Sequence, residues 1–231
     1  MYINEKNISE LSSSLKKHKH LRISNFLTTD YATKISDCLK NEIDWGLACR
    51  LNGKPETFLK TNDVKNLSNE NKKLLKLQIN EEFQFIYNSY MMVTAYIEKR
   101  NPNLFLNKVL EWLNHPDTIK YFKTLTKDSS IIKINAQATR YLPGHFLTQH
   151  NDENEQEGRL YAYVIGFSEN WNPDWGGLLS LLDSKGNIVS TLIPEYNSLS
   201  IFKVPQNHFV SYVSPMAKNP RLAITGWLLA K

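Results

Sequence analysis

Residues 159–183, RLYAYVIGFSENWNPDWGGLLSLLD, contain two short apolar runs separated by a turn-rich segment. The first run is rich in β-branched and aromatic residues, which is typical of a strand, and the Asn-Pro-Asp and Gly-Gly steps mark a break before the second. Similar runs fill the rest of the chain after residue 127: residues 130–142, 187–193, 198–204, 208–214 and 221–230. Seven or more short strands in about a hundred residues predict a sandwich or a barrel.

Residues 8–125 show mostly helical periodicity instead. In residues 30–43, DYATKISDCLKNEI, the apolar side chains recur at helical spacing. Residues 80–99 predict a long apolar-rich helix, and residues 103–126 predict two shorter helices with a break near His115-Pro116. The first half of the chain therefore reads as a helical scaffold.

Two polar segments are candidates for a lid over a site. Residues 51–73, LNGKPETFLKTNDVKNLSNENKK, are turn-rich and interrupt the helical pattern. Residues 153–158, ENEQEG, form a short acidic segment after one of the strand runs. We expect both to lie in surface loops.

The composition predicts a folded protein of 231 residues, with 41% hydrophobic and 22% charged residues. The first residues lack the pattern of a secretory signal, and no apolar run is long enough to span a bilayer. Cys38 and Cys49 are too few for a disulfide framework, so we expect reduced thiols and a cytoplasmic protein without a membrane partner. The net charge of +5 comes mainly from scattered lysines, and we interpret the densest run, KKHKHLR at 16–22, as a solvated helix end.

The motif with chemical content is His150-Asn151-Asp152. On a strand, residues two apart point to the same face, so His150 and Asp152 could bind one metal while Asn151 points away. The tripeptide is weak evidence alone, but His208 opens a later strand and would complete a set of two histidines and one carboxylate. Such a set leaves coordination positions of an octahedral metal open for co-substrates. His145 is left out because its odd separation from His150 points it to the opposite face.

Arg221, thirteen positions after His208, begins the last strand, which we expect to neighbour the strand of His208. Its planar guanidinium can pair with a carboxylate through two parallel hydrogen bonds and stays charged when buried. A divalent metal, one aspartate and one arginine leave two positive charges, which a dicarboxylate dianion would neutralise. The residues therefore predict a metal site that also binds a dicarboxylate.

An ordered set of motifs in residues 131–231 resembles the 2-oxoglutarate- and Fe(II)-dependent oxygenases of the prolyl-hydroxylase type, close to the peptidyl-prolyl hydroxylases. The segments that carry the resemblance are RYLPGHFLTQHND (140–152), GRLYAYVIGFSENWNPDWGGLLSLLD (158–183), SLSIFKVPQNHFVSYV (198–213) and RLAITGWL (221–228). The resemblance implies an α+β fold with a double-stranded β-helix core, of the jelly-roll or cupin-like kind. It implies one oxygenase domain over residues 1–231, with a mainly helical support in 1–127 and the core in 128–231.

The resemblance also implies the roles of single residues. His150, Asp152 and His208 would be the catalytic iron ligands, and Arg221 would hold the distal carboxylate of 2-oxoglutarate. Tyr141, ahead of the Pro-Gly turn, matches a tyrosine that adds a hydroxyl to that carboxylate or faces the substrate. The implied cofactors are Fe(II) and 2-oxoglutarate, with ascorbate as an optional reductant.

The implied activity is hydroxylation of a prolyl residue in a protein, with O2 as co-substrate and succinate and CO2 as co-products. A translation component is one candidate substrate, which would suit the basic charge of the chain. An oxygenase acting on a non-prolyl substrate is an alternative within the same chemistry. Nucleic-acid demethylases of this family have a second arginine six positions after the first, where this chain has Trp227, so nucleic acid is disfavoured as a substrate. A non-catalytic metal-binding barrel or scaffold is the alternative from another class, and Arg221 argues against it.

Overall fold

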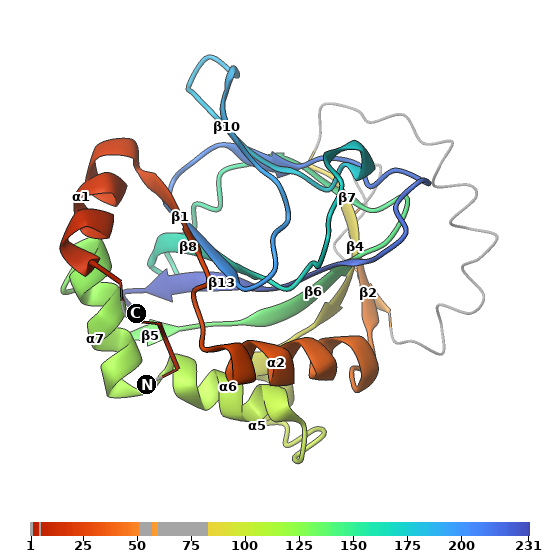
Figure 1. Ribbon diagram of the computed structural model, residues 1–231, viewed down its shortest axis with the longest axis horizontal. Coiled ribbons are helices and arrows are strands. Elements are labelled where there is room, and N and C mark those ends of the chain that lie inside the picture. Colours follow the sequence, from red (N-terminus) through yellow and green to blue (C-terminus); the bar gives the residue numbers. More distant parts are fainter. Residues whose placement is uncertain (1, 5, 51–56, 60–82) are drawn as a thin grey trace.

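The computed structural model describes residues 2–4, 6–50, 57–59 and 83–231. These residues form a 13-stranded sheet that curls on itself, with helices along its outer side (Figure 1). Of the predicted polar segment 51–73, only Thr57–Leu59 is described, as a strand, and the remainder lies outside the described residues. The second candidate lid, residues 153–158, forms a turn between two strands.

The strands follow the spatial order β1-β11-β8-β13-β6-β4-β7-β12-β9-β10, with β2, β3 and β5 attached beside this path. Their bounds are β1 His20–Ser24, β2 Gly46–Arg50, β3 Thr57–Leu59, β4 Phe85–Tyr90, β5 Lys133–Ile134, β6 Gln137–Tyr141, β7 Phe146–His150, β8 Arg159–Gly166, β9 Leu179–Leu182, β10 Ile188–Leu192, β11 Ser198–Lys203, β12 His208–Val210 and β13 Arg221–Leu229. All the predicted strand runs after residue 127 are confirmed. The barrel prediction is confirmed in the form of a double-stranded β-helix.

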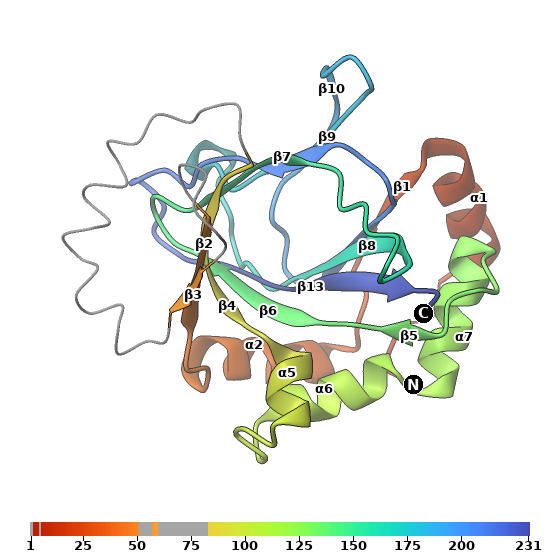
Figure 2. The ribbon, with the colours of Figure 1, turned by 180° about the vertical axis from the view of Figure 1, so that it is seen from behind.

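Strand β4 closes the curl. Its C-terminal part pairs with β6, where Asn88 lies opposite Arg140, and its N-terminal part pairs with β7, where Phe85 lies opposite Leu147. One strand thus belongs to both walls of the curl, and the two walls face each other (Figure 2). Side chains of both walls line a hollow between them. Because side chains alternate along each strand, every strand of these walls sends one set of residues inward and one set outward.

The two sets form two separate cores. The outer set, with Ile165, Leu199 and Ile224 among its members, is buried against the helices. The inner set, which includes Phe85, Tyr141 and Phe202, lines the interior of the curl. Helices therefore stabilise the sheet from outside, and the inner face remains available for a site.

The helices are α1 Ile8–His18, α2 Thr29–Asn41, α5 Met92–Ile97, α6 Phe105–Leu113 and α7 Pro116–Thr126. The predicted helix at 30–43 corresponds to α2, and the predicted break separates α6 from α7. At that break Pro116 occupies the first turn of α7, while His115 caps the helix by accepting a hydrogen bond from the Asp117 backbone N–H. None of the described helices is long and apolar enough to cross a bilayer.

The long helix predicted over residues 80–99 is wrong. Of its residues, 83–99 are described: these include strand β4, in which all six residues are buried, and within this range only Met92–Ile97 is helical. The local signal for a strand was the alternation of Phe83, Phe85 and Tyr87, which was outweighed in the prediction by the length of the apolar run. Pairing with strands on both sides decides the structure, and this contribution comes from distant parts of the chain.

The first half of the chain is accordingly more than a helical support. Strand β1 pairs with β11, β2 pairs with β4, and β4 pairs with β6 and β7, so residues from the first half extend the same sheet. The predicted division at residue 127 does not coincide with a boundary of the sheet.

Candidate active site

The two histidines of the predicted site lie on adjacent strands. His150 ends β7 and His208 begins β12, and the two residues are direct partners in the antiparallel register. Their ring centres are 4.1 Å apart. The Nδ1 atom of His150 lies 2.9 Å from the Thr148 carbonyl oxygen, and that of His208 lies 2.7 Å from the Gln206 carbonyl oxygen. With Nδ1–H donating to a carbonyl in each ring, both Nε2 lone pairs are available to a metal.

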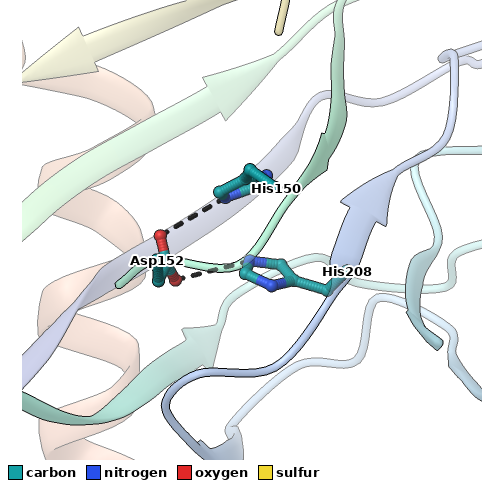
Figure 3. A group of neighbouring side chains, drawn as sticks. All are labelled: His150, Asp152 and His208. Carbon is teal, nitrogen blue, oxygen red and sulfur yellow. Dashed lines mark ion pairs between the residues drawn. The ribbon is translucent and has the colours of Figure 1, made fainter. Parts of the chain in front are cut away.

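Asp152 completes the cluster, but not in the way that strand alternation predicts. It lies two residues beyond the end of β7 in a left-handed conformation, with a φ of 63°. This turn places its Oδ1 3.3 Å from His150 Nε2 and its Oδ2 3.4 Å from His208 Nε2 (Figure 3). Asp is one of the few residues that adopt this conformation at low cost. The residues are therefore brought together as expected, by a tight turn rather than by a continuous strand.

The electrostatics of the cluster suit a divalent metal. Burial lowers the pKa of His208 to about 4, so its imidazole is neutral at physiological pH. Burial opposes ionisation of Asp152, but the His150 hydrogen bond and the electrostatic interactions with both imidazoles hold the pKa of this carboxyl below its ordinary value. The ligand atoms all lie within 4.8 Å of one another. One carboxylate and two imidazoles form the donor set typical of non-haem Fe(II).

A guanidinium and an indole support the Asp152 turn. Arg159, at the start of β8, donates a hydrogen bond of 3.3 Å to the Asp152 carbonyl oxygen and one of 2.9 Å to the Glu157 carboxylate. Its guanidinium carbon lies 3.6 Å from the centre of a ring of Trp227. These contacts fix the backbone of the turn and so the direction of its carboxylate.

Arg221 and Tyr141 lie opposite each other on β13 and β6. The guanidinium carbon of Arg221 is 4.8 Å from the centre of the Tyr141 ring, and both side chains are buried. Burial raises the pKa of Tyr141 to about 12, so its phenol remains a hydrogen-bond donor. No ion pair joins the Arg221 guanidinium to a carboxylate in the part of the chain that the structure describes.

The expectation that β13 neighbours β12 is wrong. Strand β12 pairs with β7 and β9, whereas β13 pairs with β5, β6 and β8. The strands of the candidate metal ligands and the strand of Arg221 therefore belong to opposite walls, and Arg221 lines the same cavity as the ligands. A ligand that spans from the metal to the guanidinium would bridge the two walls.

All of these side chains line one cavity of about 550 Å³. Three aromatic side chains of its wall, Phe83, Phe85 and Tyr87, were not predicted as site residues because their segment was assigned to a helix. The ring of Tyr87 lies nearly parallel to that of Tyr141, with centres 5.1 Å apart. The remaining wall is mainly apolar and includes Leu147, Ala162, Val164, Leu179, Phe202 and Val210.

His145, which the sequence excluded as a ligand, lies outside this cavity lining. It is buried just before β7, and its Nδ1 accepts a hydrogen bond from the Leu142 backbone N–H at 3.1 Å. Burial lowers the pKa of His145 to about 4, so it acts as a neutral hydrogen-bond acceptor inside the protein.

Comparison with known proteins gives the family that this arrangement resembles. Residues 136–229 match the family model of the 2OG-Fe(II) oxygenase superfamily. The matched segment contains all five predicted site residues, His150, Asp152, His208, Arg221 and Tyr141. The match supports an oxidoreductase with Fe(II) and 2-oxoglutarate as cofactors, which are the cofactors that the sequence predicts.

Three further similarities are to single proteins. The chain is 26% identical over 176 residues to prolyl 3-hydroxylase OGFOD1 of Mus musculus, an alignment that covers 74% of this chain and 31% of the mouse protein. In fold it is similar to a prolyl-4-hydroxylase of Pseudomonas putida, with a TM-score of 0.58, 16% identity and coverage of 97% and 99% of the two chains. It is also similar to a Trichoplax adhaerens prolyl hydroxylase solved with a peptide fragment of hypoxia inducible factor, with a TM-score of 0.54, 16% identity and coverage of 98% and 94%.

The chain spans less than a third of the length of the curated relatives that it matches. The residues of its candidate site nevertheless fit both cofactors. The three candidate ligand side chains offer one carboxylate and two imidazole nitrogens, and the buried Arg221 guanidinium has no carboxylate partner among the described residues. An iron ion would suit the first group, and the distal carboxylate of 2-oxoglutarate would suit the second.

Proposed function

We propose that this protein hydroxylates a prolyl residue of a protein substrate and consumes 2-oxoglutarate and O2, with succinate and CO2 as co-products. In this proposal His150, Asp152 and His208 bind Fe(II), while Arg221 and Tyr141 bind the distal carboxylate of 2-oxoglutarate. The family relationship supports the reaction class, and the names of the relatives support proline as the target.

The single observation that carries the catalytic assignment is the environment of Arg221. Its side chain is 5% exposed, it lines the same cavity as the metal cluster, and no carboxylate among the described residues pairs with it. An uncompensated buried charge costs several kcal/mol, and a dianionic co-substrate would remove that cost. A scaffold that bound only a metal would have no use for this cation.

The residues of the protein orient the proposed metal ligands and exclude water from the cavity. Iron together with 2-oxoglutarate and O2 supplies the oxidant that converts a C–H bond of the substrate into C–OH. The Thr148 and Gln206 carbonyls orient the two imidazoles, and Arg159 holds the turn of Asp152. The aromatic and aliphatic wall keeps bulk water away from the reacting atoms.

The substrate class is part of the proposal. The Trichoplax adhaerens relative was solved with a peptide fragment bound, which supports a peptide as the ligand of such a cavity. A translation component is our candidate for the protein substrate, supported by the net charge of +5, which favours acidic surroundings such as those of ribosomal RNA. We also propose a cytoplasmic location, supported by the two free cysteines, of which Cys38 is buried.

The experiment is to load the protein anaerobically with Fe(II), add 2-oxoglutarate and admit air, with and without a panel of proline-containing peptides from translation proteins. We expect peptide-stimulated succinate formation and a peptide mass gain of one oxygen atom on proline. Succinate formation with the oxygen on another residue would point to a non-prolyl oxygenase. A protein that binds one iron and never forms succinate would be the non-catalytic barrel.

A further inference from the structure

Alternate residues of β6, together with one residue just before that strand, line the cavity. Gln137, Thr139 and Tyr141 belong to β6, and Asn135 lies two residues before its start. Tyr141 lies opposite Arg221, and Gln137 lies opposite Thr225, further along β13. The two carboxamides therefore lie on the part of the wall that 2-oxoglutarate, held at the Arg221 end, leaves to the substrate.

The carboxamide of Asn135 has a fixed orientation. Its Oδ1 accepts a hydrogen bond of 2.7 Å from the Trp227 backbone N–H, which identifies that atom as the oxygen. Gly226 makes this approach possible, because a Cβ at that position would lie 2.1 Å from the Asn135 carbonyl oxygen. The Asn135 side-chain NH2 consequently points away from Trp227, and no acceptor for it is found among the described residues.

The carboxamide of Gln137 is oriented in the same way. Its Oε1 lies 3.1 Å from the Ser89 hydroxyl, which also lies 3.6 Å from the Met91 sulfur. A hydroxyl has one proton, and an amide oxygen is a much stronger acceptor than a thioether, so Ser89 donates to Gln137. The Gln137 NH2 group likewise has no acceptor within the described parts of the chain.

We propose that Asn135 and Gln137 bind the backbone of the substrate, their NH2 groups donating to the carbonyls of residues i and i+2 of an extended peptide. This inference rests on the proposed function, because it assumes a peptide substrate in this cavity. Carbonyls that face one side of an extended peptide are separated by roughly 6.6 Å. Asn135 and Gln137 are two residues apart in the chain and line the same cavity, so two such carbonyls of one peptide are the acceptors that we assign to them.

The pair of donors defines a class of substrate. In a helix, carbonyls rise by about 1.5 Å per residue and are already bonded within the helix, so they could not satisfy both amides. The target residue must therefore lie in an extended or locally unfolded segment. Since the contacts are to the backbone, they select conformation rather than side-chain sequence.

The test uses variants that remove the NH2 donors. Asn135→Asp and Gln137→Glu retain the oxygens that accept from Trp227 and Ser89. Gln137→Met removes the donor without adding charge, although it also removes the oxygen that accepts from Ser89. Asn103→Asp, at an exposed position outside the cavity lining, is the charge-matched control. The affinity of the iron- and 2-oxoglutarate-loaded protein for a proline peptide that the wild type hydroxylates is measured under argon.

Each donor variant should weaken peptide binding roughly five- to tenfold, which corresponds to one hydrogen bond, and the control should bind as the wild type does. A second series uses peptides in which one backbone carbonyl is replaced by CH2. The wild type should lose a similar factor for two carbonyls that are two residues apart, and each variant should become insensitive to one of them. This selective insensitivity is not expected of a general structural defect, which would weaken all peptides equally.

The outcomes separate this inference from the proposed function. Hydroxylation of proline together with unchanged peptide affinity in all three variants would overturn the carbonyl contacts and leave the prolyl hydroxylase standing. Paired carbonyl dependence for a peptide that is hydroxylated on another residue would overturn the prolyl target and retain the contacts. A wild type that binds no peptide in the panel would overturn both.

Discussion

The cavity lining contains groups that carry chemistry and groups that enclose it, and the two kinds are distributed differently over the chain. The second half supplies the proposed metal ligands and Arg221, from β7, β12, β13 and the turn at Asp152. Both halves supply apolar side chains, and those of the first half, such as Phe85 and Tyr87, come from β4. Substitution of a ligand and substitution of an apolar lining residue should therefore have different effects.

The largest effect is expected at the carboxylate among the proposed metal ligands. Asp152→Ala removes the only anionic member of the metal cluster, so turnover that depends on iron should be abolished while the fold remains largely intact. Succinate formation and metal content, measured together with the far-UV circular dichroism spectrum, test this. The matched control is Glu155→Ala, at an exposed carboxylate in the same loop. Activity of Asp152→Ala at the wild-type level would refute the ligand assignment.

The second-largest effect is expected at Arg221, which we propose binds 2-oxoglutarate rather than the metal. Arg221→Met should raise the KM for 2-oxoglutarate by roughly 100-fold, because hydrogen bonds to charged groups contribute about 1.5–3 kcal/mol each and the guanidinium can make two. Iron affinity, measured without 2-oxoglutarate, should stay close to that of the wild type. An unchanged KM would show that the distal carboxylate binds elsewhere.

Substitution of Phe85, an apolar residue of the cavity lining, should lower the stability of the protein and leave its iron binding unchanged. Phe85 is 3% exposed, so Phe85→Ala should lower the free energy of unfolding by about 3–5 kcal/mol through lost burial and a residual cavity. Urea unfolding of the metal-free protein gives this number, and isothermal titration with Fe(II) under argon tests whether the ligand set is retained. Loss of iron binding in a variant that is still folded would show that this apolar residue also positions the metal ligands.

The smallest effect is a pH dependence that arises outside the cavity lining. In the folded protein the pKa of His145 is about 4, against 6.5 for an unperturbed histidine, so unfolding takes up a proton in the interval between them. The contribution of neutral His145 to stability is complete above pH 6.5 and is lost as the pH falls to about 4, which amounts to at most about 3 kcal/mol. His145→Asn retains an acceptor for the Leu142 N–H and should reduce the loss of stability between pH 7 and pH 4.5. Equal losses in the two proteins would show that His145 is not the titrating group.

The sequence predicts the second half of the chain better than the first, for a physical reason. Strands such as β8 and β11 are short runs rich in apolar residues that end at turn residues. Such runs can be recognised as strands from the neighbouring sequence alone. Strand β4 is buried along its whole length between β2, β6 and β7, and its composition is equally compatible with a buried helix. Its identity depends on partners far away in the sequence.

The site shows the same limit in finer detail. Residue types and their order along the chain were sufficient to name His150, Asp152, His208 and Arg221, and the family resemblance added Tyr141. The structure brings all five to one cavity. The geometry that brings them together differs from the predicted one, because Asp152 lies in a left-handed turn rather than on a strand, and β13 belongs to the wall opposite β12. The aromatic residues that β4 contributes to the cavity lining were not predicted. Whether an apolar side chain faces a cavity depends on how the strands pair, and this is determined only in the folded sheet.

The left-handed turn at residue 152 has a consequence for how this family can diverge. Asn adopts the same conformation at least as readily as Asp, so an exchange of one for the other would preserve the turn and remove the negative charge. Loss of the metal and loss of the fold are therefore separable events in evolution. A descendant with Asn at this position could retain the barrel and the peptide contacts that we propose for Asn135 and Gln137. Such a protein could bind the former substrate without modifying it.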